Sequence, residues 1–207
     1  MARVLCQDCL YPLITCVCEH LTHIKHKTQL VILQHPSEIK SAKNTVKLLK
    51  LISNNIEIHV GETEDDFVDI KASLLTDPSK CALLFPSESA STVKQINDLN
   101  QSINTLIVID GTWRKAKKML ILNPWLLQFT QLRLTENIKA NYQIRKTSVA
   151  NGLSTIEAVA YALGELEHIG ISPFFCALDG LKQSFTKRMP SSVKNRYPLD
   201  GDNNDNN

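Results

Sequence analysis

The chain has 207 residues, of which 43% are hydrophobic and 21% are charged, the composition of a globular protein long enough to bury a core. No apolar run approaches the roughly eighteen residues of a membrane-spanning helix, and residues 1–10 lack the apolar segment of a signal peptide. We therefore expect a cytoplasmic protein without a membrane partner. Thiols stay reduced in that compartment, so the six cysteines are expected to be metal ligands or core residues rather than disulfides.

The net charge of +2 is unevenly distributed along the chain. Residues 51–100 carry nine acidic and three basic side chains, whereas residues 101–150 carry eight basic and two acidic ones. A basic segment of this kind suits a phosphate-rich partner. The alternative is that Lys115, Lys117 and Lys118 form an ordinary solvated helix face, and the sequence alone leaves both interpretations open.

In chain order, short apolar runs alternate with longer amphipathic segments, which predicts an α/β fold with a mostly parallel sheet and flanking helices. Strands are expected at residues 29–33, 56–60, 81–85, 105–109 and 128–134, and helices at 41–52, 65–75, 89–99, 113–122, 155–169 and 173–189. We expect Ser89 and Ser154 to cap the helices that follow them, and Gly170 to end the helix that Ser154 opens. Residues 1–27 are expected to form a small head, residues 28–197 one larger domain and residues 198–207 a disordered tail.

Four cysteines of the head lie within thirteen residues in the pattern C-x2-C-x6-C-x-C: Cys6, Cys9, Cys16 and Cys18. Four thiolates at such spacing can close a tetrahedral site, and a short segment with few apolar residues gains its shape from the metal. We therefore predict a structural zinc site. The alternatives are unrelated reduced cysteines, or a site in which a nearby histidine (His20, His23 or His26) replaces a thiol.

The two other cysteines, Cys81 and Cys176, lie in apolar runs. Free cysteines behave as small hydrophobic residues. We expect both to be buried packing residues.

The residues that directly follow the expected strands are candidates for chemistry, because ligands of open parallel sheets bind at the carboxyl ends of the strands. They are residues 34–37 after the first strand, Pro86 and Ser87 after the third, and residues 110–113 after the fourth, with residues 151–157 opening a later helix. The turn Asp-Gly-Thr at residues 110–112 places a carboxylate beside the free N–H groups of a helix start. Alternatively, Asp110 or Thr112 only caps this helix and Trp113 only anchors it to the core.

Taken together, these motifs resemble the DTW-domain family, named for aspartate, any residue, threonine and tryptophan. The resemblance covers about residues 6–185 and rests on motifs that occur in order along the chain: the cysteine head; His35-Pro36 with Glu38 and Asn44-Thr45; Leu84-Phe85-Pro86-Ser87; Asp110-Gly111-Thr112-Trp113 followed by Lys115-Ala116; Leu122-Asn123-Pro124-Trp125-Leu126; Tyr142-Gln143-Ile144-Arg145; and Leu153-Ser154-Thr155-Ile156-Glu157-Ala158.

The resemblance implies a tRNA-uridine aminocarboxypropyltransferase with a SPOUT-like α/β fold and a trefoil knot. Such an enzyme transfers the 3-amino-3-carboxypropyl group of S-adenosylmethionine to N3 of a uridine in the variable loop of tRNA and releases methylthioadenosine. Residues 28–197 would then be the catalytic domain.

The same resemblance gives roles to the residues at the strand ends. The cosubstrate would be held by Phe85, Pro86, Ser87, Asp110, Gly111, Trp113, Ser154 and Thr155. Asp110 is the expected general base for the uridine imide, and Trp113 would stack on the target base, an interaction worth about 1–3 kcal/mol. Thr112 and His35 complete the expected catalytic set.

Each role has an alternative. Asp110 can orient the base or bind the cosubstrate's amino group, Trp113 can pack on adenine or in the core, His35 can be structural, and Glu157 can form a capping box with Ser154. The expected phosphate contacts are Arg114, Lys115, Lys117, Lys118, Lys139, Arg145 and Lys146.

Two other functions remain open at this point. A methyltransferase of SPOUT type would use the same cosubstrate and RNA, and a non-catalytic zinc-containing RNA-binding protein would need only the head and the basic segment. The sequence leaves open which tRNAs are bound, whether ribosomal RNA is the substrate, and the oligomeric state.

Overall fold

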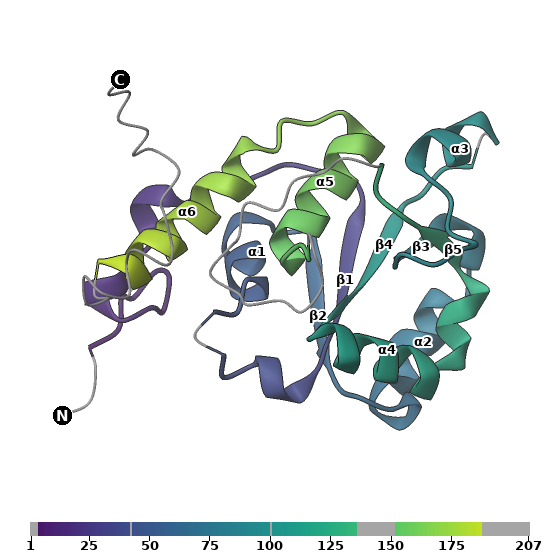
Figure 1. The fold of residues 1–207 in the computed structure, drawn as a ribbon, viewed down its shortest axis with the longest axis horizontal. Helices are drawn as coiled ribbons and strands as arrows, with labels where there is room; N and C mark the ends of the chain where they lie inside the picture. The colour runs from purple at the N-terminus through teal and green to yellow at the C-terminus, as the bar shows by residue number, and fades with distance from the viewer. Residues whose placement is uncertain (1–3, 42, 100, 136–151, 188–207) are drawn as a thin grey trace, which may run out of the picture.

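The computed structural model describes residues 4–41, 43–99, 101–135 and 152–187. Its centre is a five-stranded sheet in the order β2-β1-β4-β3-β5, and every neighbouring pair of strands is parallel (Figure 1). The strands are β1 (Gln29–Gln34), β2 (Ile56–Val60), β3 (Cys81–Leu84), β4 (Thr105–Asp110) and β5 (Thr130–Leu132). The predicted α/β class with a parallel sheet is confirmed.

Helices connect the strands and cover the sheet. They are α1 (Val46–Ile52), α2 (Val68–Leu74), α3 (Val93–Asp98), α4 (Trp113–Leu122), α5 (Thr155–Glu167) and α6 (Ser172–Thr186), together with the short 3-10 helices η1 (Leu13–Thr15), η2 (Cys18–His20), η3 (Pro36–Glu38), η4 (Glu64–Phe67), η5 (Pro78–Lys80) and η6 (Pro124–Gln128). Among the helices formed by the described residues, none has both the length and the apolar character to cross a membrane.

Some helix boundaries differ from the sequence predictions for local reasons. The helix expected at residues 89–99 begins at Val93, because Thr92 rather than Ser89 is its cap and forms a capping box with Gln95. The helix expected at 155–169 ends at Glu167, where His168 takes a left-handed conformation (φ 56°), so Gly170 does not end it. In contrast, α4 has the predicted bounds, and Ser154 caps α5 as predicted.

The sheet is buried on both faces because side chains of its central strands alternate between two cores. Leu30 and Ile32 of β1 pack with α1, α5 and α6, whereas Val31 and Leu33 pack with α2, α4 and η6. A three-layer sandwich results. Continuous apolar runs of the kind at residues 30–33 are typical of strands buried on both faces.

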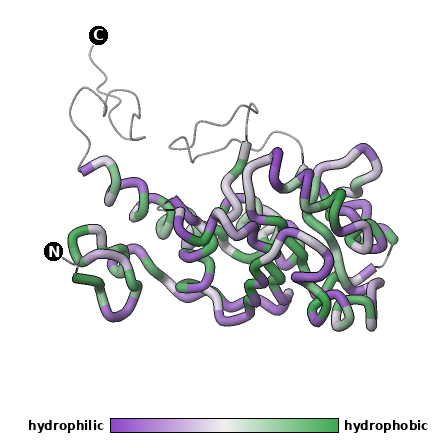
Figure 2. The backbone as a smooth tube through the Cα atoms, turned by 90° about the horizontal axis from the view of Figure 1, so that it is seen from below, coloured by the Kyte–Doolittle hydropathy of each residue, from purple (hydrophilic) through white to green (hydrophobic). Residues whose placement is uncertain are grey.

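The head packs against α6 at one end of the molecule (Figure 1). Tyr11 and Val17 belong to the same hydrophobic core as α6. The imidazole of His20 lies on Gly180, where a Cβ atom would come within 2.5 Å of the ring. Hydrophobic residues recur along the head, where they are coloured green near the N-terminus in Figure 2. Several of them are exposed: Val4, Leu5, Leu10, Leu13 and Ile14. The interior of the head is therefore continuous with the core of the α/β domain.

Candidate functional site

The carboxyl ends of β1 and β4 lie side by side in the middle of the sheet, with Gln34 in register with Asp110. The chain leaves β1 toward β2 at one edge, and it leaves β4 toward β5 at the other edge. The connections therefore diverge between β1 and β4. In open α/β sheets, ligands bind in the crevice at this topological switch point.

Asp110 lies at the centre of this region and is only 3% exposed. Its Oδ2 accepts a hydrogen bond of 2.9 Å from Gln34 Nε2, and its Oδ1 accepts one of 2.5 Å from the hydroxyl of Thr155. The backbone carbonyl of Asp110 accepts from His35 N–H at 2.9 Å. One buried side chain thus joins β1, β4 and the start of α5. The structure brings the side chains of Asp110 and Thr155 together, whereas His35 meets Asp110 through its backbone N–H.

The N-terminus of α5 is held by a capping box. The N–H and the hydroxyl of Ser154 both donate to Glu157 Oε2, at 2.7 and 2.6 Å. Glu157 is fully buried. The alternative interpretation of Glu157, as a capping residue, is therefore confirmed, and it keeps the first turn of α5 in place beside Asp110.

The turn after β4 passes close to its neighbours at Gly111, so a Cβ atom there would be crowded. A Cβ atom at Gly111 would lie 3.3 Å from the Cβ of Lys115 and 3.7 Å from that of His35. Thr112 then caps α4, and its hydroxyl accepts a hydrogen bond from Lys115 N–H. The cap alternative for Thr112 is confirmed, and the N-terminus of α4 lies at the carboxyl edge of the sheet.

Trp113 is half-buried and packs against the α2–α4 core. Its ring meets the buried ring of Phe85 edge to face, with centroids 6.2 Å apart. Pro86 is exposed, and the Ser87 hydroxyl donates to Gln131 at 2.5 Å. The end of β3 therefore lies next to the first turn of α4, as a binding site shared by the two loops requires.

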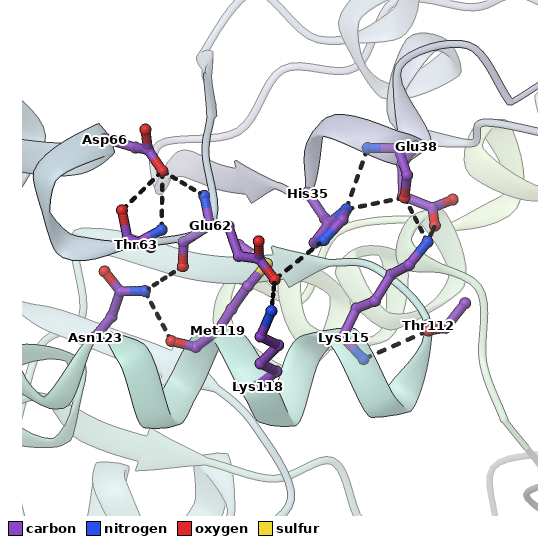
Figure 3. Close-up of polar contacts among 11 residues, drawn as sticks. His35, Glu38, Glu62, Thr63, Asp66, Thr112, Lys115, Lys118, Met119 and Asn123 are labelled. Atoms are coloured by element: carbon purple, nitrogen blue, oxygen red, sulfur yellow. Dashed lines mark hydrogen bonds and ion pairs between the residues drawn. The ribbon is translucent and has the colours of Figure 1, made fainter.

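Two lysines of α4 point across the edge toward the loops that follow β1 and β2 (Figure 3). Lys115 Nζ donates to the Ser37 hydroxyl and lies 3.4 Å from Oε1 of the buried Glu38. Lys118 Nζ lies 2.7 Å from Glu62 Oε1 and, by hydrogen bonding to it, lowers the pKa of the Glu62 carboxyl. These pairs connect α4 to the two loops that follow β1 and β2.

His35 lies between the same loops (Figure 3). Its Nδ1 accepts a hydrogen bond of 3.1 Å from Ser37 N–H, and its Nε2 lies 3.5 Å from Glu62 Oε1. Because Nδ1 is an acceptor, the proton of the neutral ring belongs on Nε2, where it faces the carboxylate. Both ring nitrogens therefore have partners within the protein.

Glu62 is a residue of this site that the sequence analysis missed. It follows β2 after one glycine, so the rule that selected residues behind the other strands applies to it as well. Its backbone is held by Asn123, whose side-chain amide donates to Glu62 O at 2.9 Å. Glu62 is the first of five acidic residues within residues 62–69, so its position behind a strand does not stand out in the sequence.

The basic residues of α4 divide into two groups. Lys115, which is half-buried, and Lys118, which is exposed, form the ion pairs just described, whereas the exposed Arg114 and Lys117 take part in neither pair. The other three expected phosphate contacts, Lys139, Arg145 and Lys146, lie outside the described residues.

The four cysteines of the head converge as their spacing predicts. All four sulfurs lie within 4.8 Å of one another, with Sγ distances of 3.6 Å for Cys6 to Cys18, 3.7 Å for Cys9 to Cys16 and 3.6 Å for Cys6 to Cys16. Zinc–sulfur bonds of about 2.3 Å in a tetrahedron place the sulfurs about 3.8 Å apart. Within the cluster, the N–H groups of Cys9 and Asp8 lower the pKa of the Cys6 thiol to about 7, whereas hydrogen bonding to Cys16 raises the pKa of the Cys18 thiol. The cluster can therefore hold a metal ion.

The other cysteines and the histidines of the head have different places. Cys81 is buried as predicted, but the prediction for Cys176 is wrong, because it lies on the exposed face of α6. His20 packs on Gly180, and His26 hydrogen-bonds to Thr28 O and the Ser53 hydroxyl, each at 2.7 Å. Among the described residues, no histidine joins the four thiols.

Comparisons with known proteins agree with these features. The DTW domain matches residues 3–190. A Macaca fascicularis protein named tRNA-uridine aminocarboxypropyltransferase 2 is 32% identical over 167 residues, which cover 78% of this chain and 56% of that protein. The Drosophila melanogaster protein of the same name is 31% identical over 169 residues, covering 78% of this chain and 66% of that protein. The Arabidopsis thaliana tRNA-uridine aminocarboxypropyltransferase A is 28% identical over 196 residues, which cover 81% of this chain and 74% of that protein.

The chain thus spans between half and two thirds of the length of the first two relatives. No solved structure matches it. Since the domain match extends over most of the 207 residues and includes both the cysteine cluster and the Asp110 turn, this chain belongs to the DTW domain family.

Proposed function

We propose that this protein is a tRNA-uridine aminocarboxypropyltransferase that uses S-adenosylmethionine and modifies N3 of a uridine in the tRNA variable loop. The main support is the DTW domain match over residues 3–190, together with relatives whose names state this activity. The clustering of Asp110, Thr155 and the N-termini of α4 and α5 at the switch point of the sheet is consistent with it.

The reaction replaces a carbon–sulfur bond by a carbon–nitrogen bond. Uridine N3 attacks the γ-carbon of the aminocarboxypropyl chain, the electron pair of the breaking bond goes to the sulfonium sulfur, and the N3 proton passes to a base. Methylthioadenosine leaves. Because the methyl carbon adjoins the same sulfur, the orientation of the cosubstrate decides which group is transferred.

The cosubstrate is proposed to lie across the ends of β3 and β4. Phe85, Pro86, Ser87 and the 110–113 turn would hold the adenosine. The N–H groups at the start of α5, beside Ser154 and Thr155, would hold the carboxylate of the methionine part, since helix N-termini bind anions. The buried Asp110 carboxylate keeps this helix start against β4 through Thr155.

For Asp110, we propose that its main role is to position the start of α5 beside β4. Its two oxygens accept hydrogen bonds from Gln34 and Thr155. The general-base role expected from the sequence stays a prediction, as do proton transfer by His35 and catalysis by Thr112. Trp113, half-buried against Phe85, would offer the exposed part of its indole to the target base.

The RNA would approach along the outer face of α4. Arg114 and Lys117 are exposed there, and side chains of this kind contact phosphates without reading sequence. Lys115 and Lys118, which pair with Glu38 and Glu62, would instead shape the site. Contacts by Lys139, Arg145 and Lys146 stay a prediction.

The head is proposed to bind one structural zinc ion through Cys6, Cys9, Cys16 and Cys18, whose sulfur separations suit a tetrahedral thiolate site. The division into a zinc head and a catalytic domain follows from this proposal. The SPOUT-like trefoil knot and the cytoplasmic location remain predictions.

Product analysis tests this function. Purified protein incubated with tRNA and S-adenosylmethionine is expected to release methylthioadenosine in step with the formation of 3-(3-amino-3-carboxypropyl)uridine, measured by mass spectrometry of the nucleosides. Release of S-adenosylhomocysteine would instead identify a methyltransferase.

The non-catalytic alternative is tested in cells. If bulk tRNA from cells with the Asp110→Asn protein carries as much modified uridine as that from wild-type cells, the residue has no part in the reaction. If cells lacking the protein also retain the modification, the proposed activity is refuted.

A further inference from the structure

A cavity of about 360 Å³ lies between the head, the connection from β1 to α1, and the end of α6. Small-molecule and nucleotide pockets have volumes of about 300–1,000 Å³. The residues that line it come from three parts of the chain: Tyr11 and Thr15 of the head, Lys40 and Lys47 around the start of α1, and Ser184 and Phe185 of α6. None of them belongs to the site around Asp110.

The charged side chains that line this cavity are positive. Among the described residues that line it, Lys40 and Lys47 are charged and no carboxylate is present. Lys40 is exposed at the rim. Lys47 is held in place, because its ammonium donates to Leu10 O at 2.8 Å and lies 3.9 Å from the centre of the Tyr11 ring.

The remainder of the lining suits a flat, partly apolar group. Phe185 is half-buried and offers an aromatic ring, Ile39 is 51% exposed at the rim, and Ser41 and Thr15 add hydroxyls. A phosphate next to a planar ring is the chemistry of a nucleotide. RNA-binding proteins hold unstacked bases on aromatic side chains and phosphates on lysines.

The cavity also adjoins the proposed catalytic edge through one short segment. Glu38 in this segment pairs with Lys115 of α4, whereas the next residues, Ile39 and Lys40, line the cavity. The amide of Asn44 donates to Glu38 O at 3.1 Å and fixes the segment between the two places. The loop that follows β1 therefore contributes residues to both the edge and the cavity.

We infer that this cavity binds a nucleotide of the tRNA substrate, away from the modified uridine, with its phosphate at Lys40 and Lys47 and its base against Phe185. This inference rests on the proposed function, which supplies the RNA. It gives the head and α6 a direct part in substrate binding.

Binding measurements with matched variants test the inference. Lys40→Glu is expected to weaken binding of tRNA about tenfold and to reduce the dependence of log Kd on log salt by about one unit, and Lys47→Met to act in the same direction. Lys50→Glu is the control, since this exposed lysine of α1, the helix that also carries Lys47, lies outside the cavity and the variant has the same net charge as Lys40→Glu. It is expected to change Kd by less than twofold. In turnover, Lys40→Glu should raise KM for tRNA and leave kcat unchanged.

The outcomes separate the inference from the function. Equal tRNA affinities of Lys40→Glu and Lys50→Glu would overturn the cavity as an RNA site while methylthioadenosine release still supports the function. Failure of the wild-type protein to release methylthioadenosine, with tRNA affinity that depends on Lys40 and not on Lys50, would refute the function and leave the site intact. If uridine 5′-monophosphate alone binds, and Lys40→Glu abolishes this binding without changing tRNA affinity, the occupant is a free nucleotide and the inference is wrong.

Discussion

At the scale of single residues, Asp110 joins segments that are far apart in the chain. Gln34 precedes it by 76 residues and Thr155 follows it by 45, yet both donate to its carboxylate inside the protein. Hydrogen bonds to charged groups contribute about 1.5–3 kcal/mol each, and a buried acceptor that loses its donor is costly. The position of the first turn of α5 relative to β4 therefore depends on a few side chains.

Thr155→Val removes one donor while it preserves the shape of the side chain. We expect the free energy of unfolding to fall by about 1.5–3 kcal/mol and kcat/KM to fall about 10- to 100-fold through misplacement of α5. Denaturant unfolding and methylthioadenosine release measure the two effects. Thr76→Val, at an exposed threonine after α2, is the control and should change neither.

Asp110→Asn separates positioning from proton transfer. If Asp110 acts by position, the variant keeps the acid limb of the rate–pH profile and loses activity to the same extent as Thr155→Val. A general base gives the opposite result, a loss of the acid limb with a fall in rate of at least about 100-fold. This second result would support the general-base prediction and contradict the proposal that Asp110 acts mainly by positioning.

At the scale of elements, the contact between the head and α6 depends on a glycine within a helix. Glycine is unfavourable at such positions by about 0.8–1 kcal/mol relative to alanine. At Gly180, however, a Cβ atom would come within 2.5–2.6 Å of the ring and Cβ of His20. The Cβ atom of His20 is fixed by the backbone and cannot rotate away as the end of a long side chain can. An alanine at position 180 would therefore displace the backbone of η2, which includes Cys18.

Gly180→Ala is therefore expected to destabilise the protein despite its better helix propensity. Overpacking costs about 1–3 kcal/mol, and each kcal/mol lowers Tm by about 2–4 °C in a protein of this size. Gly170→Ala is the matched control, since nothing lies within 4 Å of its Cβ position. A thermal melt in which Gly180→Ala is as stable as Gly170→Ala would show that the head does not pack on α6 in this way.

At the scale of the whole molecule, the head and the α/β domain share one hydrophobic core. The metal proposed for the head therefore supports more than its own loop. Cys6 and Cys9 are both buried at the junction with this core. Loss of the metal is expected to expose apolar residues of the junction and to weaken the docking of α6.

Changing Cys6 and Cys9 together to serine is expected to abolish an otherwise stoichiometric zinc content, measured by elemental analysis, and to lower the Tm of the whole protein. Cys176→Ser is the control, because this exposed cysteine lies outside the cluster. It should keep both the zinc and the Tm. Metal-free wild-type protein with the same Tm as a zinc-loaded sample would contradict the proposal.

Features that depend on neighbours in the chain could be predicted from the sequence. The apolar runs predicted all five strands to within a few residues, and Thr112 and Pro124 delimit α4. The capping box of Ser154 and Glu157 and the convergence of four cysteines within thirteen residues are equally local. Each of these features is determined by side chains that meet within one turn or one short loop.

Only the tertiary structure decided which of these local pieces meet. The sequence leaves open the strand order β2-β1-β4-β3-β5, the pairing of Glu62 with Lys118 and the cavity between the head and α6, and it predicts wrongly that Cys176 is buried. Hydrophobic periodicity identifies the face of a helix that is buried, but it does not identify the element that packs against that face. Contacts between residues 40 to 140 positions apart depend on how the connections cross the sheet, and this is settled by packing of the whole chain.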